Sequence, residues 1–362
     1  MSRTAMALLS AAALVAPLTA QSGGTGTIYV GTYAKHVLVL NEATLRVTDT
    51  IPVSIGVPVG ITVSADRSRM YVMEPYFEKV EVFDLATKQA VDQFTLSQGN
   101  TRVRLSGGFN VDPLQRFAIV LAKTYTKKID RFEIGPPRLL RYDLAKRQVT
   151  DTIPWPGGEE RDFARILFSP SGDLMYFFTT NEILIYDAVT LKEVDRWNLA
   201  QPLEEGMGRF NFGFPADVFE IPGWYMGAFR QTDPVQNRTL MGVARVNLEQ
   251  RSVEFYTLGP NSPASFVMSA DRRRAYGLRQ EVGNWEFWTY DLEARRVTGR
   301  IPFAGRPRMQ LTPSSNGRYV YLHGAGSTID VRDPQTFRII RTVQLPGDMT
   351  GFRLVPPLPS GR

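Results

Sequence analysis

One short pattern recurs seven times along the 362-residue chain and limits the folds that it can adopt. An alternating apolar segment ends in Asp or Asn, a polar turn follows, and a second β-rich segment begins. The Asp or Asn stands at Asn41, Asp84, Asp143, Asp187, Asn247, Asp291 and Asp333. Successive copies are 43, 59, 44, 60, 44 and 42 residues apart, so two intervals carry about 16 extra residues. This periodicity indicates repeated units of one supersecondary structure.

A second turn precedes most copies, and a segment rich in Tyr or Phe follows it. Examples are Ser64-Ala-Asp66 before Tyr71–Met73, and Asp112-Pro113 before Phe117–Leu121. Each unit therefore reads as four short strands, and period-two alternation recurs with no helical period of comparable strength. Units of this length with four strands are typical of propeller blades. The sequence predicts an all-β, seven-bladed β-propeller of four-stranded antiparallel blades.

The two ends of the repeat region predict how the ring closes. The first unit starts at Thr27 on its second strand and lacks an inner strand, whereas Met349–Val355 follows the seventh outer strand. We expect this C-terminal segment to complete blade one, because an unclosed ring would leave sheet edges free to pair with other chains. Residues 21–362 are then a single propeller domain.

Residues 1–20 have the pattern of a cleavable signal peptide. Arg3 is the only charge, an apolar run spans Ala5–Val15, and the segment ends at Ala20. The run is too short to cross a bilayer, and no second long apolar run follows it. We expect a periplasmic or secreted protein that begins near Gln21 and has no membrane span.

Composition lowers the expectation of chemistry within the chain. The absence of cysteine excludes disulfides, thiolate metal sites, covalent haem attachment and cysteine nucleophiles, and there are only two histidines. The net charge of +6 comes from scattered basic residues, which does not favour nucleic-acid binding. We predict no catalytic residues, no metal site and no cofactor bound by this chain.

The turns and the insertions resemble a known family. The Ser169-Pro-Ser-Gly172 turn and the Tyr-Asp corners resemble those of YVTN-type bacterial propellers. The insertion Asp130–Arg138 and the ending Leu345–Asp348 with Phe352–Val355 are similar to the β subunit of quinohemoprotein amine dehydrogenase. The resemblance covers nearly all of the chain after the signal peptide.

This resemblance implies a non-catalytic scaffold in a periplasmic enzyme that oxidises primary amines. The quinone and the haems would belong to partner subunits, and no catalytic residue carries over to this chain. Two alternatives stay open. One is a stand-alone exported propeller that binds a peptide, glycan or cell-envelope component. The other is a lactonase- or lyase-type enzyme, which needs channel-lining carboxylates and histidines that the predicted inner strands lack.

Loops between second and third strands are expected to gather on one face. The insertions Lys123–Pro137 and Arg230–Arg238 are such loops, and Glu74–Phe77 and Gln280–Trp285 are their shorter counterparts. Aromatic and Arg side chains are favoured at protein interfaces, so we predict a partner or ligand face here. Ordinary solvated loops are the alternative. The candidate residues are Tyr76, Phe77, Tyr125, Phe132, Arg230, Trp285, His36 and His323.

A second candidate is an anion site at the channel mouth. Arg165 and Arg308 each stand four residues before a Ser-Pro or Thr-Pro turn, with Arg104 and Arg209 predicted nearby. Converging guanidinium groups suit a carboxylate or a phosphate. The alternative is that each Arg pairs with an acidic residue of a neighbouring loop, such as Glu159 or Asp162.

Overall fold

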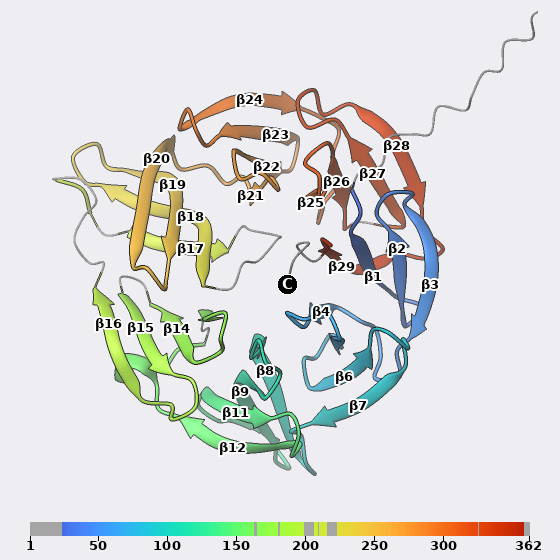
Figure 1. Ribbon diagram of the computed structural model, residues 1–362, viewed down its shortest axis with the longest axis vertical. Coiled ribbons are helices and arrows are strands. Elements are labelled where there is room, and N and C mark those ends of the chain that lie inside the picture. Colours follow the sequence, from blue (N-terminus) through green and yellow to red (C-terminus); the bar gives the residue numbers. More distant parts are fainter. Residues whose placement is uncertain are drawn as a thin grey trace, which may run out of the picture.

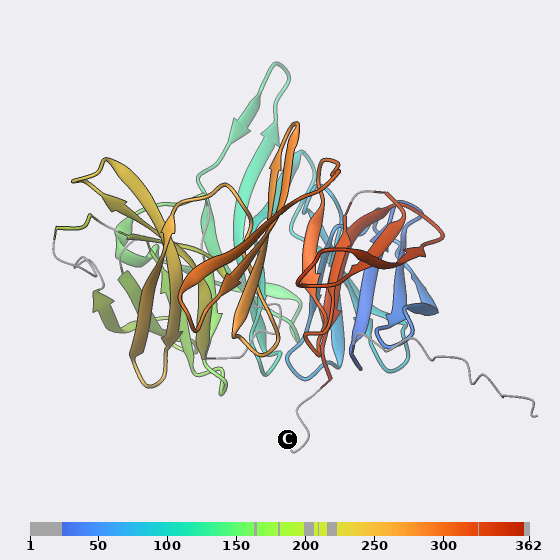
Figure 2. The same cartoon turned by 90° about the horizontal axis from the view of Figure 1, so that it is seen from above.

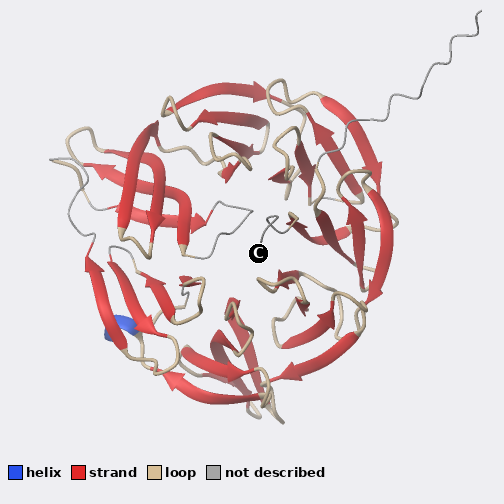
Figure 3. Ribbon diagram, in the orientation of Figure 1, coloured by secondary structure: helices blue, strands red, loops and turns tan. Residues whose placement is uncertain are grey.

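The computed structural model describes residues 24–162, 165–179, 182–198, 206–208, 210–215, 223–324 and 326–357. The predicted signal peptide and Arg209 lie outside the described residues. Strands within these ranges form seven antiparallel sheets, which are arranged as a ring around a central axis (Figure 1). Among the described residues the one helix is the short 3-10 turn η1, Pro156–Gly158 (Figure 3). The prediction of an all-β propeller is confirmed.

Each blade runs from an inner strand near the axis to an outer strand at the rim. Blade one contains β29 (Met349–Val355), β1 (Thr27–Thr32), β2 (His36–Asn41) and β3 (Arg46–Pro52). Blade two contains β4 (Gly60–Val63), β5 (Arg69–Met73), β6 (Lys79–Asp84) and β7 (Ala90–Thr95). Blade three contains β8 (Thr101–Val111), β9 (Phe117–Lys127), β11 (Arg138–Asp143) and β12 (Gln148–Ile153), and β10 (Phe132–Ile134) also pairs with β9.

The other four blades repeat this order. Blade four contains β13 (Arg165–Phe168), β14 (Leu174–Phe178), β15 (Glu182–Asp187) and β16 (Glu193–Asn198). Blade five contains β17 (Phe210–Pro215), β18 (Trp224–Asp233), β19 (Arg238–Asn247) and β20 (Ser252–Pro260). Blade six contains β21 (Val267–Met268), β22 (Arg274–Glu281), β23 (Asn284–Asp291) and β24 (Arg296–Pro302). Blade seven contains β25 (Gln310–Pro313), β26 (Val320–His323), β27 (Thr328–Arg332) and β28 (Ile339–Gln344).

The repeated Asp or Asn builds the turn between the third and fourth strands. In blade four the Asp187 carboxylate accepts hydrogen bonds from the main-chain N–H groups of Val189 (2.9 Å) and Thr190 (2.7 Å). Leu191 then takes a left-handed conformation with φ of 58°. The side-chain acceptor satisfies main-chain N–H groups that have no strand partner while the chain reverses direction. The same left-handed position recurs in the other six blades, at Leu45, Lys88, Arg147, Arg251, Arg295 and Phe337.

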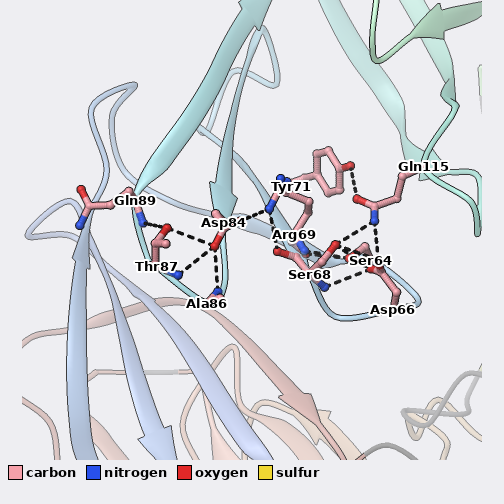
Figure 4. A network of polar contacts seen from close by, with 10 residues as sticks. All are labelled: Ser64, Asp66, Ser68, Arg69, Tyr71, Asp84, Ala86, Thr87, Gln89 and Gln115. Atoms are coloured by element: carbon pink, nitrogen blue, oxygen red, sulfur yellow. Dashed lines mark hydrogen bonds and ion pairs between the residues drawn. The ribbon is translucent and has the colours of Figure 1, made fainter. Parts of the chain in front are cut away.

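In blade two, polar contacts connect this turn with the neighbouring turn and with blade three (Figure 4). Asp84 forms an ion pair with Arg69, which follows the first-to-second-strand turn. Gln115 of blade three donates to Asp66 (2.9 Å) and accepts from the Tyr71 hydroxyl (3.1 Å). Neighbouring blades are therefore joined by polar contacts at their turns as well as by apolar packing.

The hydrophobic core lies between blades. The described residues form seven apolar clusters, and each cluster draws side chains from two neighbouring blades. On β1, Ile28 and Val30 pack toward blade seven, whereas Tyr29 packs toward blade two. Because successive side chains point to opposite faces of a strand, a strand that is buried on both faces needs an uninterrupted apolar run. This explains the apolar second strand in each unit.

The C-terminal strand closes the ring as predicted. β29 pairs with β1 in a register that runs from Thr27 opposite Val355 to Gly31 opposite Gly351. The Glu42 carboxylate is fully buried beside this joint. It accepts hydrogen bonds from Gly26 N (2.8 Å), Ser315 N (2.8 Å) and the Tyr321 hydroxyl (3.1 Å), and so links blade one to blade seven.

Candidate functional site

The connections between second and third strands emerge together on one side of the ring. The β9–β10 hairpin rises furthest on this side (Figure 2). We call it the long-loop face, defined by residues 33–35, 74–78, 123–138, 230–238 and 280–285. The opposite side carries the Asp and Asn corners and the first-to-second-strand turns, and we call it the turn face.

The most exposed apolar side chains of the described chain gather on the long-loop face. Seven large apolar residues have exposed fractions from 61% to 107%, and all of them lie in its loops: Tyr33, Tyr76, Ile129, Phe132, Ile134, Val235 and Val282. The next most exposed, Leu114 at 58%, lies on the turn face of blade three. Large exposed apolar patches are typical of binding surfaces, and three of the seven residues, Ile129, Phe132 and Ile134, lie on one hairpin.

The β9–β10 hairpin also carries an excess of positive charge. Five basic and two acidic side chains lie between Lys123 and Arg138, a net charge of +3. Some of these charges pair within the hairpin, as Lys128 does with Glu133 (3.2 Å) and Arg131 with Asp130 (3.1 Å). Such exposed pairs contribute little to stability, so these side chains are free to exchange partners.

Some of the predicted face residues are exposed and others are packed. Tyr76, Phe132 and Arg230 are exposed, as expected. Phe77 is half-buried and packs against the cluster between blades two and three, and Tyr125 is half-buried on β9.

Trp285 is also half-buried, because its indole lies against the backbone of Gly305. A Cβ at Gly305 would lie 2.5 Å from the indole ring, so only glycine allows this approach.

The two histidines have different environments. His36 is half-buried at the start of β2. The prediction that His323 contributes to the exposed face is wrong, because its side chain is 3% exposed. His323 is the last residue of β26, where its imidazole stacks on Phe352 and its Nε2 lies 2.9 Å from the Thr312 hydroxyl. Burial lowers the pKa of His323 to about 3, so the imidazole is neutral near pH 7.

The structure gives the predicted channel-mouth arginines different partners. Arg165 begins β13, where its guanidinium donates to the Phe212 carbonyl of blade five (3.3 Å) and lies over the Tyr225 ring. The Arg104 Nε donates to the Tyr76 carbonyl of blade two (3.1 Å). Arg308 is exposed two residues before β25, with φ of 65°. Contacts with main-chain carbonyls therefore help to position Arg104 and Arg165, and the anion site stays a prediction.

The acidic partners suggested for these arginines are engaged elsewhere. Asp162 pairs with Lys123 (2.9 Å), and Glu159 pairs with Arg161 (3.1 Å).

Blade five also differs in where its extra residues lie. The β18–β19 hairpin is longer than its counterpart in blade two and takes up part of the insertion.

Two pockets lie on the turn face, away from the predicted site. One, of about 410 Å³, lies between blades five and six and is lined by Trp224, Arg245, Glu254 and Arg272, among others. The other, of about 350 Å³, lies between blades one and two beside Arg67 and Asp84. The described residues contain no cluster of His, Asp and Glu suited to a metal ion. The long-loop face itself presents apolar, aromatic and basic side chains.

Sequence reasoning missed five of the seven most exposed apolar residues, namely Tyr33, Ile129, Ile134, Val235 and Val282. The sequence could have identified them, because each is a large apolar residue in or beside a predicted loop, where it has no place in the core.

The fold and the closed ring define a β-propeller. No family model matches the chain, and no curated protein sequence does. Solved structures do resemble it. The dihydro-haem d1 dehydrogenase NirN, solved in complex with DHE, is 13% identical over 93% of this chain and 76% of its own, with a TM-score of 0.55. AztD from Citrobacter koseri in its apo form is 11% identical over 91% of this chain and 98% of its own, with a TM-score of 0.53.

The propeller domain of Cps50 (Swd1) from Myceliophteria thermophila is 12% identical over 84% of this chain and 91% of its own, with a TM-score of 0.53. At such low identity these likenesses concern the fold alone. No helix among the described residues is long and apolar enough to cross a membrane.

Proposed function

We propose that this protein is a non-catalytic propeller subunit that binds a partner protein through its long-loop face. The observation that carries the proposal is the gathering there of all seven most exposed large apolar residues of the described chain. They come from blades one, two, three, five and six, so a partner on this face would contact much of the ring. Aromatic and Arg anchors such as Tyr76, Phe132 and Arg230 suit such an interface.

A more specific form of the proposal follows from the family resemblance. The partners would be the quinone-bearing and haem-bearing subunits of a periplasmic amine dehydrogenase, and this chain would be their exported scaffold. The long third-blade insertion supports this form, because in the structure it becomes the most prominent feature of the long-loop face (Figure 2). The predicted signal peptide is consistent with assembly outside the cytoplasm.

The experiment is purification of the native protein from the periplasm under mild conditions. The specific form predicts co-eluting haem absorbance and amine-dependent dye reduction. If a partner co-elutes but shows neither haem absorbance nor dye reduction, the docking proposal stands and its amine dehydrogenase form is wrong. A colourless monomer with neither signal would contradict both.

Matched variants identify the face. Tyr76→Ser and Val282→Ser should reduce the recovery of the partner, because they remove exposed apolar anchors without touching the core. Val189→Ser, at an exposed apolar residue on the turn face, should not reduce it.

A further inference from the structure

The β9–β10 hairpin presents an unpaired strand edge. Among the described residues, β10 pairs with β9 alone, in the register Phe132 opposite Lys127, Glu133 opposite Thr126 and Ile134 opposite Tyr125. All three residues of β10 are exposed. An exposed strand edge offers N–H and C=O groups with which another chain can pair.

The hydrogen-bond pattern shows which groups point outward. Beyond the two ends of β10, Lys128 N donates to Arg131 O (2.8 Å) and Gly135 N donates to Thr124 O (3.0 Å). Hydrogen-bonded and non-hydrogen-bonded pairs alternate along an antiparallel ladder. Glu133 therefore exchanges hydrogen bonds with β9, whereas the N–H and C=O groups of Phe132 and Ile134 point away from β9 toward the open edge.

The side chains beside this edge form an apolar and basic surface. Residues opposite one another in an antiparallel pair share a face of the sheet. Phe132 and Ile134 therefore share a face with Lys127 and Tyr125 of β9, and with Arg102, which is opposite Tyr125 on β8. This face combines two exposed apolar side chains with the exposed Lys127 and with Arg102, which pairs with Glu78 of blade two (3.1 Å). The other face carries Lys128 and Arg131 together with Glu133, which pairs with both cations.

We propose that β10 accepts an extended, acidic segment of the partner protein as an additional β-strand. The inference rests on the proposed function, because it assigns the mode of binding within the long-loop face. Main-chain hydrogen bonds to Phe132 and Ile134 supply affinity, and alternate side chains of the segment supply specificity. A second copy of this chain is disfavoured as the occupant, because two hairpins of net charge +3 repel each other.

The test uses a defined probe, an acetylated and fluorescently labelled peptide of alternating valine and glutamate. Its valines would pack on Phe132 and Ile134. Its glutamates would lie on the face of Lys128, Arg131 and Glu133, where the two cations outnumber the one carboxylate of β10. Binding is measured by fluorescence polarisation with the full-length mature protein. Two control peptides are used. One replaces each glutamate with lysine and tests the role of charge. The other keeps the glutamates but has N-methylated valines, and it tests main-chain pairing. We expect the first peptide to bind and both controls to bind at least about tenfold more weakly, as lost charge and main-chain pairing require.

Two variants at one position separate the main chain from the side chain. Ile134→Ala removes the apolar side chain, and Ile134→Pro also removes the outward N–H, which an edge strand tolerates. We expect Ile134→Pro to bind the probe about fivefold more weakly than Ile134→Ala, the effect of one lost hydrogen bond. Circular dichroism confirms that both variants fold, and the N-methylated peptide tests the same point without a variant.

Failure of the probe to bind, or equal binding of the N-methylated peptide, would overturn strand addition. Equal binding of the valine–lysine peptide would overturn the preference for an acidic segment. If the native partner still depends on Tyr76 and Val282 in either case, the docking proposal stands and only its β10 mode is wrong.

Discussion

The imidazole of His323 stacks on the phenyl ring of Phe352, with ring centroids 3.8 Å apart and 13° between the ring planes. His323 ends the second strand of blade seven, and Phe352 belongs to β29, which completes blade one. The contact therefore lies at the joint that closes the ring. The enclosed imidazole is held at Nε2 by Thr312, and its Nδ1 has no hydrogen-bond partner among the described residues.

This burial predicts a pH-dependent stability. The folded-state pKa of His323 is lowered to about 3 by burial, whereas an unfolded histidine titrates near 6.5. Above pH 6.5 both states are neutral and the group has no effect. Between about pH 6.5 and 3 the unfolded state binds a proton that the folded state does not, so stability falls as the pH falls. The loss is about 2 kcal/mol at pH 5.

The measurement is the urea midpoint of unfolding at pH 7 and pH 5. The wild type should lose more stability over this range than His323→Phe, which cannot titrate. Thr312→Val keeps the buried imidazole, so it should be less stable at both pH values but keep the wild-type pH dependence. The same pH dependence in wild type and His323→Phe would contradict the assignment.

Substitutions of Glu42 test whether its buried hydrogen bonds stabilise the joint between blades one and seven. Glu42→Ala leaves the buried donors Gly26 N, Ser315 N and Tyr321 Oη without their acceptor, which should cost about 3 kcal/mol of unfolding free energy. Glu42→Gln keeps one carbonyl acceptor and should cost less. Chemical denaturation measures both, and a near-neutral Glu42→Ala would show that the network does not stabilise closure.

The repeated corner gives a prediction at a single position. Asp187→Ala removes the acceptor for Val189 N and Thr190 N and should cost about 1–2 kcal/mol. Asp187→Asn should be nearly neutral, because Asn41 and Asn247 make the same turn in blades one and five. Thermal unfolding compares the two variants. If both lost equal stability, charge rather than hydrogen bonding would be the determinant of the corner.

Ring closure can be tested by truncation. Removal of residues 349–362 deletes β29, exposes the inner edge of β1 and opens the cluster that contains Ile28 and Leu354. We expect loss of cooperative unfolding and aggregation, since a bare edge pairs with other chains. Truncation after Pro357 retains β29 and serves as the control. Cooperative unfolding of the longer deletion at the wild-type midpoint would contradict closure by β29.

Local patterns predicted the blades, because each corner needs a side-chain acceptor and each second strand needs an apolar run. Residues 349–355 were placed correctly for a different reason, because the first unit lacks an inner strand and this segment follows the last outer strand. The long β9 strand of blade three was not predicted in full. Its pairing with Thr101–Leu105 of β8 depends on tertiary contacts that no local sequence pattern records.

The site was predicted only in part. The sequence located the face and two of its exposed aromatic residues, Tyr76 and Phe132, but it placed His323 in a loop. In the structure one more strand residue at the end of β26 puts that side chain on the buried face with Tyr321, because side-chain direction alternates along a strand. Strand ends and side-chain packing are set by tertiary contacts.

Docking on the long-loop face is tested most directly by site-specific photocrosslinking in the cells that produce the protein. A photoreactive amino acid replaces Ile129 at the tip of the β9–β10 hairpin or, in the matched control, Leu114 on the turn face of the same blade. We predict a discrete crosslinked partner from position 129 and none from position 114. Crosslinking from position 114 alone, or from neither position, would contradict it.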